Sequence, residues 1–399
     1  MTEWRKRCLG EITSFMSKGI PPKYVERENE NTVRVLNQKC NRNFEINYEE
    51  SRLHDCSKKK VPDDKMLRPG DVLINSTGTG TAGRVAQLYD VPTSTTIDGH
   101  MILLRPTEEI DSIYYGYAVK AFQSQIETLA EGSTGQTEIN RKRLQEEIVI
   151  SFPKEKETQD RIAHFLLNID EKIKVNNKIN KNLLEQALTL YATHFSSVDK
   201  NGCIGDYCAV KSGFAFKSSW WTNNGVKVIK IGSINQDNLN LLECSYVDED
   251  KADKAKDFVV KAGDLLIAMT GATIGKFSMV PYSSEVLLVN QRVGKFFLGN
   301  HPVKKLPFIY CTLKQPEVYN EVVNRGQGSA QPNISASDIM SIPCVIPSQD
   351  VINDFNDAAQ PLFDLIISNQ RENQQLSELR NTLLPKLMSG ELDVSDIEF

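Results

Sequence analysis

The sequence predicts an α+β fold: two tandem copies of a mixed α/β domain, separated by two long antiparallel coiled-coil helices. Three observations predict it. The two halves of the chain match at an offset of about 193–196 residues, β-rich runs alternate with turn residues inside each half, and a heptad pattern follows each half. The predicted division is 1–155 and 201–347 for the globular domains, with helices in 156–200 and 348–399, the latter ending in an acidic tail.

The internal repeat rests on ordered matches at nearly one offset, which chance does not readily produce. The clearest are LGEI (9–12) with IGDY (204–207), VRVLN (33–37) with VKVIK (226–230), RPGDVLINSTG (68–78) with KAGDLLIAMTG (261–271), and GSTGQTEI (132–139) with GSAQPNI (328–334). Within each copy, runs such as VRVLN, DVLI and MILL are bounded by Gly, Pro, Asn and Ser. This pattern is typical of short strands in a curved or twisted sheet.

A strict 4-3 spacing follows each globular copy and predicts two heptad helices. The first has seam positions Ile162, Leu166, Ile169, Ile173, Asn176, Asn180, Leu183, Ala187, Leu190 and His194. A shift of 193 gives Phe355, Ala359, Leu362, Ile366, Asn369, Asn373, Leu376, Arg380, Leu383 and Leu387. From about Thr158 to Phe195, the first helix would be roughly 57 Å long at ~1.5 Å per residue. Because one chain supplies both helices, antiparallel pairing is the simplest closure.

The four seam asparagines, Asn176, Asn180, Asn369 and Asn373, occupy the same register in both copies. Paired polar residues at core positions fix helix register at some cost in stability. The alternative is that they are solvated where a helix splays from its partner.

Composition indicates an ordinary globular protein, with 40 % apolar and 25 % charged residues. No stretch approaches the ~20 consecutive apolar residues of a membrane span, and the first 20 residues lack an apolar signal core. We therefore expect a cytoplasmic protein with no membrane association. The eight cysteines form no CxxC pair, so reduced structural thiols are expected and a metal site is not.

The net charge of −5 does not exclude a nucleic-acid partner, because the acidity is concentrated at one end. Residues 348–399 contain 3 Lys or Arg against 10 Asp or Glu, which leaves the remainder close to neutral. A near-neutral body can present a basic face, since phosphate binding depends on where charges lie.

Searches for catalytic motifs predict no enzyme. The string GTGTAG (78–83), with Asp98 beyond it, suggests a dinucleotide fingerprint, but the residues that follow read as strand and turn where a helix is required. GATIGK (271–276) has the wrong spacing for a P-loop, and PDDK (62–65) reads as a solvated turn. GxSxG, HExxH and histidine pairs at metal-ligand spacing do not occur.

The two copies share loops rich in Arg, Lys, Gln, Asn, Ser, Thr and Gly, which are residues that contact phosphates and base edges. A single loop of this kind is more often a solvated turn, but their duplication on one framework, with different tips, favours DNA binding. The candidate residues in the first copy are Lys39, Arg42, Lys58, Lys59, Lys60, Thr77, Arg84, Gln136 and Arg141. Those in the second copy are Lys217, Lys230, Thr270, Lys276, Gln291, Arg292 and Gln331.

The whole chain resembles the DNA specificity subunits of type I restriction-modification systems. The segments that carry the resemblance are GDLLIAMTGATIGK (263–276), NQRV (290–293), QGSAQPNIS (327–335), IPCVIP (342–347) and NTLLPKLMSGELDV (381–394). The first copy departs from the pattern at TTIDGHMILL (95–104), where the second has VLLVNQRVGKFF (286–297).

The resemblance implies two target-recognition domains that each read half of an interrupted DNA sequence, with the helices as a ruler. It also implies no catalytic residues and no cofactor on this chain. Expected partners are two methyltransferase subunits, which use S-adenosylmethionine, and two restriction/translocase subunits, which use ATP and Mg²⁺. Two alternatives stay open on the residues: a stand-alone nucleotide-binding enzyme using GTGTAG, and a coiled-coil scaffold without DNA readout.

Overall fold

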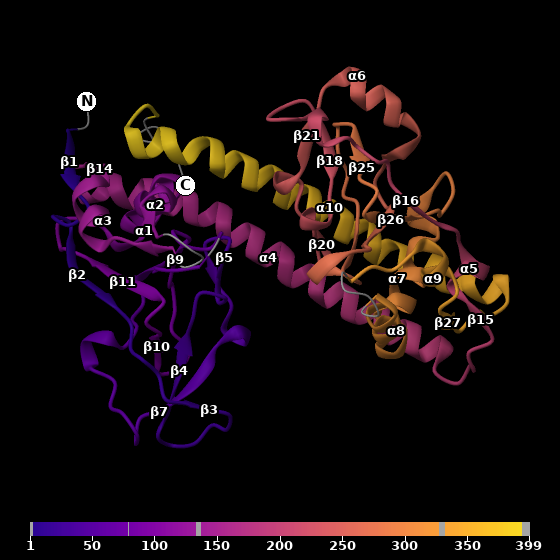
Figure 1. The fold of residues 1–399 in the computed structure, drawn as a ribbon, viewed down its shortest axis with the longest axis horizontal. Helices are drawn as coiled ribbons and strands as arrows, with labels where there is room; N and C mark the ends of the chain where they lie inside the picture. The colour runs from indigo at the N-terminus through magenta and orange to yellow at the C-terminus, as the bar shows by residue number, and fades with distance from the viewer. Residues whose placement is uncertain (1–2, 79, 133–136, 327–331, 393–399) are drawn as a thin grey trace. The chain divides into compact units, whose positions relative to one another are not determined.

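The computed structural model describes residues 3–78, 80–132, 137–326 and 332–392. It divides into two compact units, Met1–Asp170 with Leu379–Phe399, and Glu171–Glu378. Each unit contains one globular domain together with parts of both long helices (Figure 1).

The first globular domain is built on two four-stranded sheets. One has the order β2-β11-β8-β9, with β2 at Thr13–Lys18, β11 at Met101–Pro106, β8 at Val72–Asn75 and β9 at Val85–Gln87. The other has the order β10-β4-β7-β3, with β10 at Thr95–Ile97, β4 at Thr32–Leu36, β7 at Arg52–Asp55 and β3 at Tyr24–Val25. β10 and β4 are parallel, whereas the other pairs in both sheets are antiparallel. The predicted mixed fold is confirmed.

Both faces of β8 are buried, which explains its unbroken apolar run VLI. Successive side chains of a strand point to opposite faces. Val72 and Ile74 therefore join a core cluster with the domain's helices, while Leu73 packs with Leu36 and Ile97 of the second sheet. The first sheet is thus the middle layer, between the helices and the second sheet (Figure 1).

The remaining elements of this domain are short. The helices are α1 at Ser112–Ala121, α2 at Gln123–Thr128 and α3 at Arg141–Glu147. The paired strands are β1 at Trp4–Cys8 with β14 at Val149–Pro153, β5 at Asn41–Arg42 with β6 at Glu45–Ile46, and β12 at Ala130–Glu131 with β13 at Glu138–Ile139. Asp111 caps α1 by accepting the backbone N–H groups of Ile113 and Tyr114. The PDDK string forms a 3₁₀ turn at Asp63–Lys65, as predicted.

The second globular domain repeats this strand order. Its first sheet is β16-β26-β23-β24, at Val210–Ser212, Val293–Phe296, Leu265–Ala268 and Phe277–Met279. Its second sheet is β17-β21-β18-β25-β22, at Trp221–Thr222, Ser245–Val247, Val226–Ile229, Leu287–Val289 and Val259–Val260. β25 pairs with β18 in parallel, as β10 does with β4, and β22 adds one edge strand. The predicted tandem repeat is confirmed at the level of strand order.

The shorter elements of the second domain follow the same plan. The strand pairs are β15 at Gly202–Cys203 with β27 at Pro343–Cys344, and β19 at Ile234–Asn235 with β20 at Asn238–Leu239. The helices are α5 at Ile204–Tyr207, α6 at Glu249–Ala252, α7 at Leu306–Lys314, α8 at Pro316–Gly326 and α9 at Ala336–Met340.

The two long helices are α4 at Lys156–Phe195 and α10 at Gln349–Ser389. In the first unit, Ile162 and Leu166 near the start of α4 share a core with Leu384 and Leu387 near the end of α10. In the second unit, the pairing is reversed. The late α4 residues Ala187, Tyr191 and Phe195 pack with the early α10 residues Ile352, Phe355 and Ala359. The predicted antiparallel pairing is therefore confirmed within each unit.

The heptad prediction was wrong at the end of α4. Tyr191 and Phe195 are buried there, whereas the predicted seam residue His194 is exposed. A straight α-helix drifts by about 20° per heptad relative to a 3.5-residue repeat. This end of α4 also packs against α7, where the Tyr191 hydroxyl is 3.1 Å from Thr312 Oγ1. The buried face therefore turns toward the globular domain.

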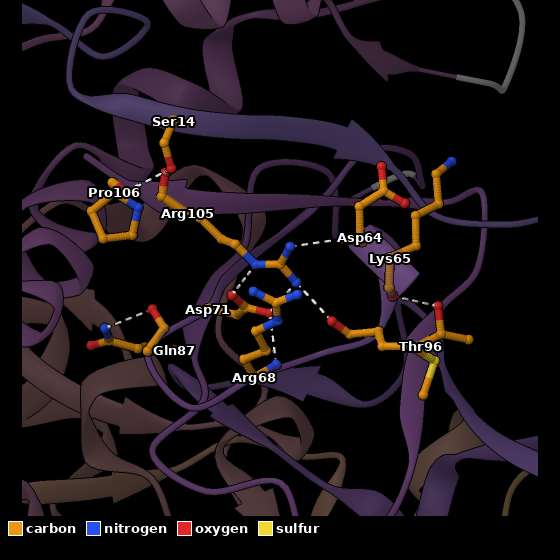
Figure 2. A network of polar contacts seen from close by, with 11 residues as sticks. Ser14, Asp64, Lys65, Arg68, Asp71, Gln87, Thr96, Arg105 and Pro106 are labelled. Atoms are coloured by element: carbon orange, nitrogen blue, oxygen red, sulfur yellow. Dashed lines mark hydrogen bonds and ion pairs between the residues drawn. The ribbon is translucent and has the colours of Figure 1, made fainter. Parts of the chain in front are cut away.

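A duplicated buried aspartate anchors the middle sheet of each domain. Asp71 of the RPGD segment is 2 % exposed, and its carboxylate accepts the Arg68 backbone N–H at 2.8 Å and Arg105 Nε at 2.7 Å. Arg105 also donates to the carbonyls of Asp64 and Met66 (Figure 2). Asp264 of KAGD is 1 % exposed and pairs with Lys295 Nζ at 2.6 Å. The shared motif is thus a structural ion pair.

The fold also bears on the GTGTAG string, on membrane-spanning helices and on the cysteines. The strand β9 follows Gly83, where a dinucleotide fingerprint requires a helix, so the context of GTGTAG is wrong for that function. Among the described helices, none combines the length and apolar character needed to cross a bilayer. All eight cysteines lie in the described residues as free thiols.

Candidate nucleic-acid interface

Four loops of the first domain converge on Thr77, which follows β8. The Thr77 hydroxyl donates to Gln38 Oε1 at 3.2 Å, and its oxygen lies 2.9 Å from His100 Nδ1. The backbone of Thr77 also forms an isolated antiparallel bridge with Glu138. The loops after β4, β8 and β10 and the segment at β13 therefore meet at one place, although they are far apart in the sequence.

A pocket of about 460 Å³ opens beside these loops. It is lined by Tyr24, Asn37, Gln38, Lys39, Glu49, Glu50, Arg52, Asp98 and His100. The Arg52 guanidinium lies 3.4 Å from the centre of the Tyr24 ring, a cation–π contact. Asp98 is 5 % exposed, and burial raises the pKa of its carboxyl. With three carboxylates, the pocket can accept hydrogen bonds as well as donate them.

The second domain builds the same junction from the matching loops. Thr270 follows β23 and bridges to Asn333, as Thr77 does to Glu138. The Met269 N–H donates to the Arg292 carbonyl at 3.0 Å, and the matching Ser76 N–H donates to the His100 carbonyl at 2.8 Å. The buried Thr270 hydroxyl has no hydrogen-bond partner within the described part of the chain.

Aromatic rings and lysines gather on the outer sheet of the second domain. Lys230 Nζ lies 4.4 Å from the centre of the Trp221 ring, and three more lysines surround Trp220. These are Lys217 at 5.7 Å, Lys251 at 5.8 Å and Lys254 at 5.3 Å from the ring centre. Such a surface offers cations to phosphates and flat rings to bases or sugars.

The structure places the predicted site residues as follows. Exposed residues are Lys39, Arg42, Lys58, Lys59, Lys60, Arg141, Lys217, Gln291 and Arg292. Partly buried residues are Thr77, Arg84, Lys230, Thr270 and Lys276. Gln136 and Gln331 lie outside the described residues.

Not all of these residues lie at the loop junctions. Lys39 and Thr77 belong to the junction of the first domain, and Thr270 and Arg292 to that of the second. The run Lys58–Lys60 follows the far end of β7, the strand whose other end carries Arg52 into the pocket. Any contact it makes with DNA is therefore separate from the pocket.

Sequence reasoning missed several junction residues. Tyr24, Arg52 and His100 line the pocket, and Trp220 and Trp221 carry the lysine cluster. The internal repeat held a usable signal for one of them, because DGH at 98–100 aligns with NQR at 290–292 and so places His100 opposite Arg292. The others are aromatic or arginine residues on short strands, where the sequence pattern resembles ordinary core and surface.

The asparagines of the long helices come together in reciprocal pairs within the second unit. Asn176 Nδ2 donates to Asn373 Oδ1 at 2.9 Å, and Asn369 Nδ2 donates to Asn180 Oδ1 at 2.8 Å. Asn176 also donates to Glu372 at 2.6 Å, and Asn373 donates to Asn177 at 2.8 Å. This network gives hydrogen-bond partners to the side-chain amides in the helix seam. The role of these asparagines in fixing the helix register stays a prediction.

The described residues contain no group of three or more His, Cys, Asp or Glu side chains suited to a metal ion. What the fold and the loop junctions define is a two-domain protein in which one duplicated scaffold presents two different polar surfaces.

The family described as type I restriction modification DNA specificity domain matches residues 1–185 and 199–378. The chain therefore belongs to the type I restriction-modification DNA specificity family, as its motifs predicted. Two specificity subunits of type I restriction enzymes from Methanocaldococcus jannaschii are similar to it, MjaVIII and MjaIX, each 24 % identical. The MjaVIII match covers 75 % of both chains, and the MjaIX match covers 88 % of this chain and 83 % of the relative.

The fold also resembles that of a solved type I S subunit from M. genitalium. The two are 19 % identical with a TM-score of 0.50, over 97 % of this chain and 96 % of that chain. Family membership supports the DNA-specificity interpretation, and it gives no support to the nucleotide-binding enzyme or to the scaffold without DNA readout.

Proposed function

We propose that this chain is the non-catalytic recognition subunit of a type I restriction-modification complex, and that each globular domain reads one half of a bipartite double-stranded DNA sequence. The observation that carries the proposal is the pair of equivalent loop junctions, at Thr77 and at Thr270, built on matching strands but lined by different side chains. A common scaffold with different loop tips suits the reading of two different half-sites.

The contacts divide by chemistry. Side chains at the junctions, such as Arg292, read base edges through directed hydrogen bonds. Exposed cations outside the junctions, such as Lys58–Lys60, bind phosphates and carry the salt dependence without sequence information. Removal of a base contact therefore relaxes one position, whereas removal of a phosphate contact weakens binding to all sequences.

The partners follow from the same duplication. Two related units on one chain offer two related surfaces, so one chain binds two methyltransferase subunits and, in the full cytoplasmic complex, two restriction/translocase subunits. This chain holds no cofactor of its own in the proposal. S-adenosylmethionine, ATP and Mg²⁺ bind to the partners.

A DNA selection tests this function. The chain is mixed with its methyltransferase partner and a library in which two random segments flank a gap of variable length. We expect enrichment of one pair of half-sites at one gap. Native mass spectrometry of the saturated complex should show two methyltransferases per chain. Absence of any enriched bipartite sequence, or tight binding of NAD or ATP by the purified chain, would contradict the proposal.

The helices are proposed to set the gap, and matched insertions test this part separately. Four residues added after Lys174 and four after Gln375 fall between the Asp170–Arg380 ion pair and the Asn176–Asn373 contact, so both contacts are kept. The insertion adds about 6 Å, which corresponds to between one and two base pairs at ~3.4 Å each. We expect the same half-sites at a longer gap. An unchanged single gap would show that the helices do not set the distance.

A further inference from the structure

The turn at Asp98–His100 of the first domain and the turn at Asn290–Arg292 of the second are the same structural element. The Asp98 backbone N–H donates to Leu36 O at 2.9 Å, and the Asn290 N–H donates to the matching Ile229 O at 3.0 Å. In each turn, the first side chain accepts the N–H of the third residue, at 2.9 Å in His100 and 3.2 Å in Arg292. The third residue is exposed in both, so each turn holds one side chain out at a fixed place.

The two projecting side chains have opposite hydrogen-bonding character. Arg292 carries a guanidinium, which is a donor only. His100 is different because an imidazole nitrogen can accept a hydrogen bond. The Thr77 hydroxyl donates to Gln38 Oε1, and the tautomer that completes this chain carries its proton on His100 Nδ1, facing the Thr77 oxygen, which leaves Nε2 as an acceptor. Asp98, Glu49 and Glu50, which line the same pocket, are acceptors as well.

We propose that this turn is the specificity-determining element of each domain, and that it selects a base with an exocyclic amine in the first half-site and guanine in the second. In the major groove, adenine N6 and cytosine N4 are donors that fit an acceptor, whereas guanine O6 and N7 are acceptors that fit the two parallel donors of an arginine. The inference rests on the proposed function, and it adds which residues determine the base preference and which bases they select.

The first domain has room to accept the turn of the second. Gly99 separates Asp98 from His100, and a Cβ built there would meet only the Ile20 carbonyl oxygen, at 3.8 Å, which is ordinary contact. The Cβ of a side chain at position 99 therefore meets no clash. Asp98→Asn keeps a carbonyl oxygen in place to accept the N–H of residue 100, as Asn290 does. The whole turn can thus be exchanged without disturbing the strands on either side.

The test uses the full chain with its methyltransferase partner in the DNA selection described above. One variant carries Asp98→Asn, Gly99→Gln and His100→Arg, and the reciprocal variant carries Asn290→Asp, Gln291→Gly and Arg292→His. We expect the first variant to change one position of the first half-site to guanine, by about 10-fold in preference, and to leave the second half-site unchanged. The reciprocal variant should lose guanine at one position of the second half-site only.

A single substitution and a matched control sharpen the test. Arg292→Ala should relax one position about 10-fold. The control Lys304→Ala removes an exposed cation of the same domain. Lys304 is next to Val303, which packs on Gly263 at the end of β23 opposite to the loop junction. This control should leave the base preference unchanged. In each variant, an unchanged preference for the other half-site of the DNA shows that the protein is folded.

Three results would overturn the inference. An exchanged turn that leaves its own half-site unaltered would show that other residues choose the base. Equal weakening on all sequences by Arg292→Ala would make that residue a phosphate contact. If the unmodified chain selects no bipartite sequence, the proposed function fails, and the inference fails with it.

Discussion

The two globular domains share a strand order but differ in the charge and aromatic content of their outer sheets. In the first, Arg52 stacks on Tyr24 beside the buried carboxylate of Asp98. In the second, Lys230 stacks on Trp221, the residue that pairs within its sheet as Tyr24 does, and Asn290 replaces the carboxylate. The comparison teaches that the scaffold fixes where side chains project, while their chemistry is free to differ between copies.

The largest effect is expected when one whole domain is exchanged, which tests whether the two domains read their half-sites independently. Replacement of residues 1–155 by the same region of a relative should change the first half of the bound sequence and leave the second half as it was. We expect affinity for the original site to fall by at least 10³-fold, close to the ratio of specific to non-specific binding. DNA selection measures both effects. A change in both half-sites would show that the domains do not read independently.

The buried ion pairs offer a second comparison, through stability. Asp71→Ala leaves Arg105 without its carboxylate, and loss of one partner of a buried pair costs about 3–5 kcal/mol. Asp264→Ala should cost less, because Lys295 is held by one carboxylate and the Val259 carbonyl and can turn toward water, whereas Arg105 is fixed by several acceptors. Denaturant unfolding measures each loss. Equal losses would contradict the proposed difference in anchoring.

The buried side chain of Lys120, on α1, gives the first unit a pH dependence, whereas Lys314 at the end of α7 in the second domain is paired with Asp237. Burial, and then the nearby Arg380 charge, lower the pKa of Lys120 to about 7. Its Nζ lies 3.9 Å from the centre of the Phe44 ring and has no hydrogen-bond partner in the described residues. Asp170, Arg380, Glu45, Tyr89 and Tyr117 are the titratable or charged groups near it.

Because the pKa of Lys120 is lower in the folded state, the unfolded chain binds more protons between pH 7 and the ordinary lysine pKa. The stability of the first unit should therefore rise with pH across that range. Lys120→Met should flatten the rise and add about 1–3 kcal/mol to the free energy of unfolding at pH 7. Thermal melting at several pH values tests this. A variant that keeps the full pH dependence would assign it to another group.

The helix asparagines should give the smallest change in stability but a visible change in DNA spacing. Asn176→Leu with Asn373→Leu replaces a polar pair by an apolar one and should stabilise the helices by up to about 1 kcal/mol. The same change removes the penalty against a shifted register, so the selected gap should broaden from one length to several. A variant that still selects one gap would show that register is fixed by the domains alone.

The sequence was enough to predict the repeat, the mixed sheets and both long helices, because strand and heptad patterns depend on residues close together in the sequence. In addition, a pattern seen in one copy of the repeat supports the same assignment in the other copy. It did not predict the turn of the buried face at Tyr191 and Phe195, which depends on packing against α7. It also did not reveal that Tyr24, Arg52 and His100 share a pocket, because loops distant in the sequence meet only in the folded domain. DNA contacts by the candidate residues stay predictions.

Each middle sheet has a strand with two unlike ends. β8 begins next to the buried Asp71–Arg105 pair and is followed at its other end by Thr77, and β23 begins next to Asp264–Lys295 and is followed by Thr270. The buried ion pair thus lies at one end of the strand, and what meets DNA in the proposed function is at the other. Substitutions at the loop end leave the ion pair intact, so such a chain can acquire new sequence preferences over generations without first losing its fold.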